Sequence, residues 1–407
     1  MARKPKTTRR RAAGRTRRPA AEPPFIRRIN EAWEIGQPLI SAATRDDGTI
    51  DWSLVATEAK RQAAAIDARL VEEMAPYDAF DIVANMHFFN HPLAVGADNY
   101  RESEHTGLIA NVEYAASLCL RRQSREGAGV SDGGPVAEKM MAWNAEIRRL
   151  LHIRLLGQVA GVRTDAAGFD RLRQGQFARE LLMRNVAYRW QEERLLRDLF
   201  ANETVAKDLR RLAGFTIDEA LRLFETITAW PFERLSETAH LGRSAARLVH
   251  GLARARRRGQ RVAAPSQTVA QLVEELSGFS DRELTARLYG MLIVGVWREI
   301  GERISFTVPE IAEAAGVSLE AMTAFVEMFS QPFGQSPVAD PVRALQAMRA
   351  RPIIHDGDSY LCVDCGDLLW AVRQQFEARL KADERAWDRY KRHRSNSAEQ
   401  TALRFLR

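Results

Sequence analysis

Apolar residues recur at every third or fourth position over most of the chain, which is the spacing of amphipathic helices. The clearest case follows Asp51, which is placed to cap a helix that Pro76 then ends. The apolar positions of this helix are Leu54, Val55, Ala59, Ala63, Ile66 and Leu70. The same spacing predicts helices over about 104–122, 136–160, 170–201, 204–213, 216–228, 232–257, 267–277, 281–303 and 367–391.

Strand-like alternation occurs in one segment, PIIHDGDSYLC (352–362), where Asp356-Gly357 is a hairpin turn signal. We therefore predict a mainly α protein, an irregular multi-helix array with one small β-hairpin. Breaks in composition divide it, and the glycine-rich REGAGVSDGGP (125–135) is the clearest of them. The expected parts are a disordered basic tail (1–28), an N-terminal helical subdomain (29–124), a linker (125–135), a central helical subdomain (136–262), a further helical subdomain (266–350) and a hairpin with long C-terminal helices (351–407).

A helix-turn-helix-like pattern occurs at TVPEIAEAAGVSLEAMTAFVEMF (307–329). Thr307 and Glu310 form a capping-box signature, and Gly316 supplies the positive φ that the turn needs. The outward face of the second helix carries Ser318, Glu320, Thr323, Glu327 and Ser330. Because carboxylates are repelled by the phosphates of a DNA groove, we expect a winged-helix-like packing or partner module rather than a groove reader.

Positive charge is concentrated in the first 28 residues, which contain 11 Lys and Arg and one acid. The whole chain has a formal net charge of +7, so the remaining residues are slightly acidic. A polyanion would therefore be met by a flexible arm, which makes nucleic acid the predicted partner. The candidate binding residues of the arm are Arg9, Arg10, Arg11, Arg15, Arg17 and Arg18. A transit peptide and a wrongly assigned upstream start codon are alternative explanations of this tail.

Two further basic runs could extend this surface. One consists of Arg254, Arg256, Arg257, Arg258 and Arg261, and the other of Arg389, Lys391, Arg392, His393 and Arg394. Such runs are usually solvated helix faces, and the first also suits the negative end of a helix dipole. With the tail they could form a discontinuous polyanion surface, for which we select Arg256, Arg257 and Arg258 as candidate nucleic-acid-binding residues.

Cysteine is rare, and its three positions, Cys119, Cys362 and Cys365, predict no disulfide framework, as expected in a reducing compartment. Cys362 and Cys365 have the C-x-x-C spacing of half a zinc knuckle, with His355 as a nearby third ligand. No second C-x-x-C exists, and no βαβ pattern surrounds this one to suggest redox chemistry. We expect two small residues that close a strand before a helix.

Three histidines lie in the span MHFFNHPLAVGADNYRESEH (86–105), where His87 and His91 would share one helical face. The metalloprotease pattern needs Glu directly after its first His, and this chain has Phe88 there. The expected role is that of helix-end histidines bonded to carbonyls or water. We predict no metal and no cofactor, and a metal-dependent hydrolase using His87, His91 and His105 is the remaining enzymatic hypothesis.

Several function classes lack their sequence signals. No phosphate-binding loop, dinucleotide fingerprint or nucleophile elbow is present. The apolar run from Leu288 to Trp297 is too short to cross a bilayer, and the N-terminal charges are not followed by the apolar segment of a secretory signal. An excess of Arg over Lys with abundant Ala is typical of a GC-rich bacterial gene. We expect a cytoplasmic protein with no membrane partner.

The C-terminal sequence RPIIHDGDSYLCVDCGDLLWAVRQQFEARLK, followed by AWDRYKRHRSNSAEQTALRFL, resembles the region that leads into a nuclease-related (NERD-like, PD-(D/E)XK-type) domain of large bacterial proteins. In that family a short hairpin precedes a helix, and an R-x-x-x-E-x-x-A-x-x-x-L helix opens the nuclease fold. That opening helix is matched loosely by Arg394, Glu399, Ala402 and Leu406. Because the chain stops about where the catalytic sheet would begin, the resemblance implies a helical regulatory region without the catalytic Asp and Glu-x-Lys.

These observations predict a non-enzymatic, nucleic-acid-associated helical protein that binds without sequence preference through its tail. The alternative is a protein-interaction scaffold, or the regulatory helical region of a nuclease whose catalytic domain is absent from this chain. No catalytic residue is assigned.

Overall fold

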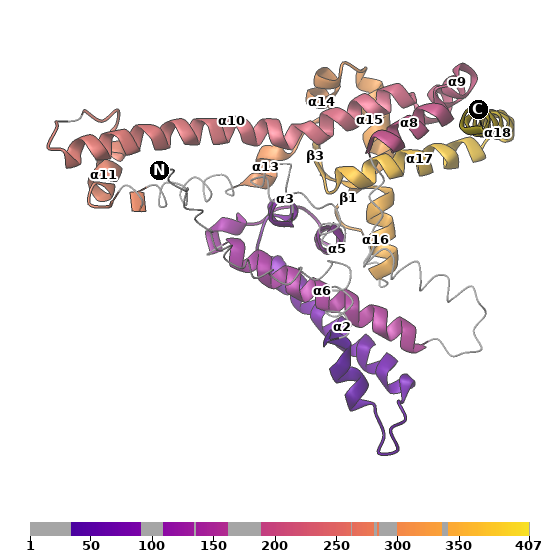
Figure 1. The fold of residues 1–407 in the computed structure, drawn as a ribbon, viewed down its shortest axis with the longest axis horizontal. Coiled ribbons are helices and arrows are strands. Elements are labelled where there is room, and N and C mark those ends of the chain that lie inside the picture. Colours follow the sequence, from indigo (N-terminus) through magenta and orange to yellow (C-terminus); the bar gives the residue numbers. More distant parts are fainter. Residues whose placement is uncertain are drawn as a thin grey trace, which may run out of the picture.

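The protein, seen in a computed structural model, is mainly helical with one small sheet, which confirms the predicted fold class (Figure 1). The structure describes residues 34–90, 109–133, 136–161, 189–261, 263–280, 283–284, 299–335 and 341–406. The tail with its candidate arginines, His91, His105 and most of the helices expected at 170–201 and 281–303 lie outside these residues.

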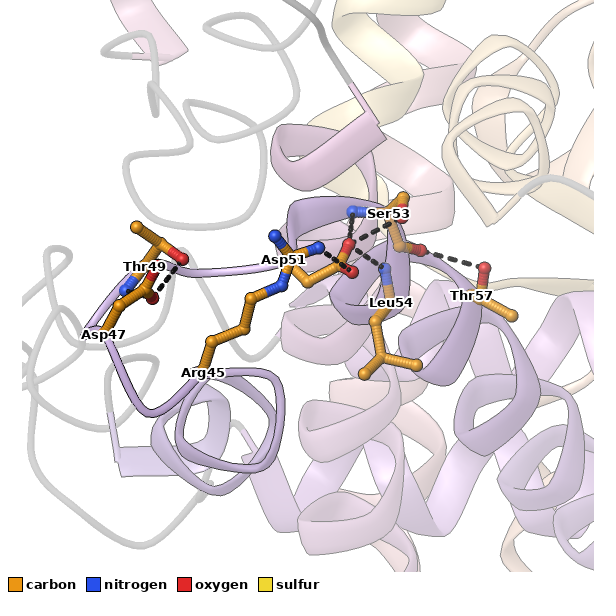
Figure 2. A network of polar contacts seen from close by, with 7 residues as sticks. All are labelled: Arg45, Asp47, Thr49, Asp51, Ser53, Leu54 and Thr57. Carbon is orange, nitrogen blue, oxygen red and sulfur yellow. Dashed lines mark hydrogen bonds and ion pairs between the residues drawn. The ribbon is translucent and has the colours of Figure 1, made fainter.

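The N-terminal body is built from α2 (Trp52–Met74), α3 (Ala79–Asn90), α5 (Ile109–Cys119) and α6 (Val136–Gly161). Helices α2 and α6 lie along one another, and α3 and α5 pack beside them (Figure 1). Figure 2 shows the start of α2, where Asp51 Oδ1 accepts hydrogen bonds from the N–H groups of Ser53 and Leu54 at 3.1 and 3.2 Å. The predicted N-cap is confirmed. Of the predicted apolar stripe, Leu54 is exposed and the other positions are buried.

The glycine-rich segment, predicted as a linker, is packed tightly against the N-terminal body over its described part. Val130 is fully buried, and a Cβ at Gly127 would lie 2.3 Å from the carbonyl carbon of Tyr77. Its described part ends in a short 3₁₀ turn, Val130–Gly133, and α6 begins at Val136. The helices on its two sides, α5 and α6, therefore share one apolar core.

The remaining described helices are α8 (Arg189–Phe200), α9 (Glu203–Ala213), α10 (Ile217–Arg257), α11 (Gln267–Leu276), α13 (Ile300–Ile304), α14 (Val308–Ala315), α15 (Leu319–Phe329), α16 (Pro341–Ala350), α17 (Cys365–Lys381) and α18 (Glu384–Leu406). Helices α13 and α16 contribute buried residues to the core of the N-terminal body, and the others form the C-terminal body and an extension from it. Two helix boundaries differ from expectation. Helix α10 continues through Pro231, where the sequence predicts a break. The helix expected from 367 to about 391 is two helices, because Asp383 Oδ1 accepts from the N–H of Ala386 and caps α18.

The small sheet has three strands in the order β1-β2-β3. The predicted hairpin is confirmed as β2 (Ile353–Asp356) and β3 (Ser359–Cys362), which pair antiparallel around Gly357 at φ +56°. Strand β1 (Ser330–Pro332) was not expected, and it pairs parallel to β2. Since α16 connects β1 to β2, these elements form a short βαβ unit.

The sheet lies between two apolar cores. Ile354 and Leu361, a cross-strand pair, belong to the core of the N-terminal body. Their neighbours Ile353 and Cys362, also a pair, face the core of the C-terminal body. This is the alternation of a strand buried on both faces, and it joins the two helical bodies through one hairpin.

No helix among the described residues combines the length and the apolar character that crossing a bilayer requires.

Candidate nucleic-acid interface

Helix α10 is anchored firmly at its N-terminus. Thr216 and Glu219 form a capping box, in which Glu219 Oε2 accepts from the Thr216 N–H at 2.8 Å. Arg210 also contacts Glu219, at 2.7 Å. The first turns are buried in the core of the C-terminal body through Ile217, Ala220, Leu221, Leu223, Phe224 and Ile227. Near Pro231, Trp230 Nε1 donates to the carbonyl of Ser305 at 3.1 Å and ties the helix to the loop before α14.

Beyond Pro231 the helix runs out from the body as an arm (Figure 1). The whole of α10, including its buried first turns, has 41 residues and is about 60 Å long at 1.5 Å per residue. At the far end α11 packs on it through a small apolar cluster of Val249 and Ala253 with Val273 and Leu276. Gly259, at φ +71°, then turns the chain back. The arm thus holds its end away from the two main cores.

The end of this arm is strongly basic. Residues 238–261 contain seven Arg and no acid. The side chains of Arg254, Arg256, Arg257, Arg258 and Arg261, which we call the α10 tip, are all exposed. Within the tip, Arg256 makes an ion pair with Glu274 of α11. The three predicted residues Arg256, Arg257 and Arg258 are therefore exposed together at the end of the arm, with the exposed carboxylate of Glu274 beside Arg256.

The second basic run has a different environment. Arg389 makes two bonds of 2.7 Å to the largely buried carboxylate of Asp208 in α9, and this contact lowers the pKa of Asp208. His393 Nε2 lies 2.8 Å from the carbonyl of Asp198, and Lys391 pairs with Asp388 at 2.8 Å. Arg389 and His393 hold α18 against α9 and α8, whereas Lys391 pairs within α18 and is exposed, as are Arg392 and Arg394.

The helix-turn-helix-like segment has the predicted shape. Glu310 accepts from both the N–H and the hydroxyl of Thr307 at 2.8 Å, and Gly316 adopts φ +61° between α14 and α15. Phe306, which precedes the N-cap Thr307 of α14, exchanges two N–H···O bonds of 2.9 Å with Tyr360 of β3. The β2–β3 hairpin therefore lies beside the two helices in the manner of a wing.

The outward face of α15 is acidic, as expected, with Glu320, Thr323 and Glu327 exposed. The prediction that Ser330 belongs to this outward face is wrong, because Ser330 is buried at the start of β1. Its neighbour Gln331 is also buried, and its amide donates to the carbonyl of Arg351 at 2.8 Å. The exposed face consequently offers no cation to a phosphate backbone.

Two of the sequence candidates for metal or redox chemistry meet at the corner between β3 and α17. His87 of α3 lies with Nδ1 3.1 Å from the carbonyl oxygen of Val363, which is between Cys362 and Cys365. Burial lowers the pKa of His87, so the neutral ring donates its Nδ1 proton to that carbonyl. The expected role of a helix-end histidine bonded to a carbonyl is confirmed for this residue.

Metal binding gains no support from this corner. Among the described residues, no three His, Cys, Asp or Glu side chains are grouped so that they could hold an ion. His355 is turned toward the hairpin itself, where it stacks on Tyr360 at 5.2 Å and approaches the carbonyl of Gly357. His91 and His105 lie outside the described residues.

The basic residues of the α10 tip could be identified from the sequence, but their position at the end of an arm could not. The acid-free stretch from 238 to 261 is visible in the sequence, but its distance from the acidic body depends on α10 continuing through Pro231. Comparison of the chain with protein-family models, with curated proteins and with solved structures found no match in any of the three.

Proposed function

We propose that this protein is a nucleic-acid-associated protein that binds without sequence preference and has no catalytic role of its own. The observation that carries the proposal is the α10 tip, where basic side chains gather at the end of a helical arm. Together with the basic tail it offers two separate contacts to one polyanion. The chain after residue 28 is slightly acidic as a whole, which favours contact with a polyanion through its locally basic segments.

The physical basis is the release of counterions from a phosphate backbone. Each phosphate neutralised by Lys or Arg contributes about 0.9 to the slope of log affinity against log salt for duplex DNA. Contacts of this kind carry no sequence information, since they are made to the backbone and not to base edges. A side chain such as Arg suits this role because its planar fork can make two bonds to one phosphate.

The test measures binding of the full chain to a labelled DNA duplex and a matching RNA duplex by fluorescence anisotropy over a range of salt concentrations. The triple variant R256Q/R257Q/R258Q removes three charges from the α10 tip. Its matched control, R385Q/K391Q/R392Q, removes three exposed charges from α18. A deletion of residues 2–28 tests the tail.

We expect the tip variant to flatten the salt dependence by about 2 to 3 in slope, and the tail deletion to weaken binding of both duplexes at about 50 mM salt. The α18 control should retain the slope of the unmodified protein. Equal effects of the tip and control triples would remove the tip from the interface. Unchanged binding after the tail deletion would remove the tail, and an intact protein that binds neither duplex overturns the proposal.

A protein partner is the second candidate, and the acidic face of α15 is the observation that favours it. Glu320 and Glu327 are exposed on the helix that would enter a groove in a DNA-binding helix-turn-helix. If that helix approached DNA, the variant E320Q/E327Q would bind nucleic acid more tightly because two repulsive charges are gone. We expect the variant E320Q/E327Q to have the nucleic-acid affinity of the unmodified protein, because this face of α15 would bind a protein partner and not DNA.

A further inference from the structure

The two cysteines of the C-x-x-C sequence lie close together at a strand-to-helix corner. Cys362 is the last residue of β3 and Cys365 is the first residue of α17. Their sulfur atoms are 3.7 Å apart, and both side chains are partly buried at the edge of the C-terminal core. A disulfide requires a sulfur–sulfur distance of about 2 Å, so side-chain rotation with a small backbone adjustment would close the bond.

The backbone between the two cysteines is held from both sides. The N–H of Val363 donates to the carbonyl of Pro352 at 2.8 Å, and its own carbonyl accepts from His87. The Val363 side chain is fully buried in the N-terminal core. Asp364 Oδ1 accepts from the N–H of Gly366 at 3.1 Å and fixes the turn into α17. The thiols are therefore presented in a fixed relation to each other.

The surrounding topology also favours redox chemistry. The sequence shows no βαβ pattern around these cysteines, but the structure contains one, because β1 and β2 are parallel and α16 connects them. The C-x-x-C sequence follows on the neighbouring strand β3. A C-x-x-C pair beside a βαβ unit is the setting in which such pairs cycle between dithiol and disulfide.

We propose that Cys362 and Cys365 form a reversible dithiol–disulfide pair, oxidised by exchange with a disulfide-containing thiol compound or protein. One cysteine thiol loses its proton, and its thiolate attacks a sulfur of that disulfide, which expels one thiolate and leaves a mixed disulfide. The second cysteine then loses its proton, and its thiolate attacks the protein sulfur of the mixed disulfide and expels the other thiolate. The two released protons convert the expelled thiolates to thiols. Two protein thiols and one disulfide thus become one protein disulfide and two thiols, and two electrons pass to the oxidant.

The third cysteine provides an internal reference. Cys119 is buried in the N-terminal core, and burial raises the pKa of its thiol to about 12. A thiol with that pKa is inert at neutral pH, since the thiolate is the reacting form. Any oxidation of the folded chain by exchange should leave Cys119 as a thiol, and the variant C119S should behave as the unmodified protein.

The experiment equilibrates the full-length protein in mixtures of reduced and oxidised glutathione, traps thiols with an alkylating agent and measures the intact mass. As the proportion of oxidised glutathione rises, we expect Cys362 and Cys365 to stop being alkylated together, at a single midpoint of the glutathione ratio. The oxidised chain should be lighter than the reduced, unalkylated chain by two hydrogen atoms. In the folded reduced protein Cys362 and Cys365 should be alkylated at least about tenfold faster than Cys119. The variants C362S and C365S should each stop at a glutathione adduct.

Two results would overturn the proposal. One is a pair that stays reduced over the whole range up to oxidised glutathione alone. The other is an unmodified protein that accumulates glutathione adducts with no bond between Cys362 and Cys365. Peptide mapping of the oxidised protein identifies the bonded residues, so the result does not depend on whether a serine variant folds.

Discussion

Replacement of Asp81 tests the energetic account of how three segments of the N-terminal body are joined. This carboxylate is 2% exposed, and it accepts from the N–H of Val130 at 2.7 Å and from the N–H of Gly301 at 3.3 Å. It therefore links α3 to the glycine-rich segment and to α13. Its own N–H is bonded to Asp78 Oδ1 at 2.8 Å, so the loop before α3 takes part in the same network.

The expected cost follows from the groups that lose their acceptor. In D81A the N–H groups of Val130 and Gly301 stay in a buried site, and an unsatisfied buried donor costs about 1–3 kcal/mol. The unmodified protein already bears the desolvation of this carboxylate, since burial raises the pKa of Asp81. The two unsatisfied N–H groups destabilise D81A, and removal of the buried carboxylate offsets part of that cost. We expect D81A to lower the free energy of unfolding by about 2–4 kcal/mol.

Urea unfolding followed by circular dichroism at pH 7 measures this difference. The matched control is D132A, because Asp132 is an exposed aspartate two residues from Val130. We expect D132A to change the free energy of unfolding by less than about 0.5 kcal/mol, as exposed surface positions do. A D81A value as small as that of D132A would refute the claim that this carboxylate joins the three segments.

The pH dependence of the same site has a defined sign. A carboxyl with a raised pKa in the folded state binds its proton more tightly when folded, so its contribution to stability falls as pH rises above about 4. The isosteric D81N variant does not titrate at this position. The stability advantage of the unmodified protein over D81N should therefore be larger at pH 4 than at pH 7. A difference that grows toward pH 7 would contradict the raised pKa.

Four further predictions address packing, a helical glycine, an ion pair and a helix cap. In G301A the new Cβ would lie 2.3 Å from the backbone of Phe80 and Asp81, so we expect a loss of about 1–3 kcal/mol in urea unfolding. G251A, at an exposed helical glycine with open space around it, should instead stabilise by about 0.5–1 kcal/mol. A double-mutant cycle on Arg389 and Asp208 should give a larger coupling than one on the exposed pair Arg197–Asp218, since Asp208 is largely buried. The Ser53 hydroxyl, the Leu54 N–H and Arg45 lower the pKa of Asp51 to about 2, so the melting-temperature difference between the unmodified protein and D51A should shrink as pH falls from 4 to 2.

Local sequence rules predicted the elements whose determinants lie within one helix or turn. The Asp51 cap, the Thr307–Glu310 capping box and the turn at Gly357 each depend on residues only a few positions apart. The buried stripe of α2 follows for the same reason, because its spacing is a property of the helix alone. Leu54 departs from it because its side chain, in the first turn of α2, is about half exposed and no described element buries it.

Contacts between distant residues explain where the local rules failed. A proline inside a helix costs about 3 kcal/mol, so a break at Pro231 is the local expectation. The helix continues because its flanks are held elsewhere, with Leu235 buried in the N-terminal core and Trp230 bonded to Ser305. The two basic runs look alike in sequence, yet Arg389 is bound by Asp208, which is 181 residues away. The sequences of the two basic runs alone therefore do not show which run contains a residue that binds another helix.

The cysteine corner shows how one missed strand can change the interpretation of a motif. The C-x-x-C sequence lacked a βαβ context only because β1, Ser330–Pro332, has no alternating pattern that marks a strand. Its pairing with β2 depends on register across α16, and the buried Gln331 is satisfied by the carbonyl of Arg351 rather than by a neighbour in sequence. Once that strand is in place, the cysteines lie beside a βαβ unit, and His87 from α3 holds the backbone between them. The chemistry that we propose for the pair therefore depends on the joining of the two bodies, and a change that separates α3 from β3 should alter the midpoint of its oxidation.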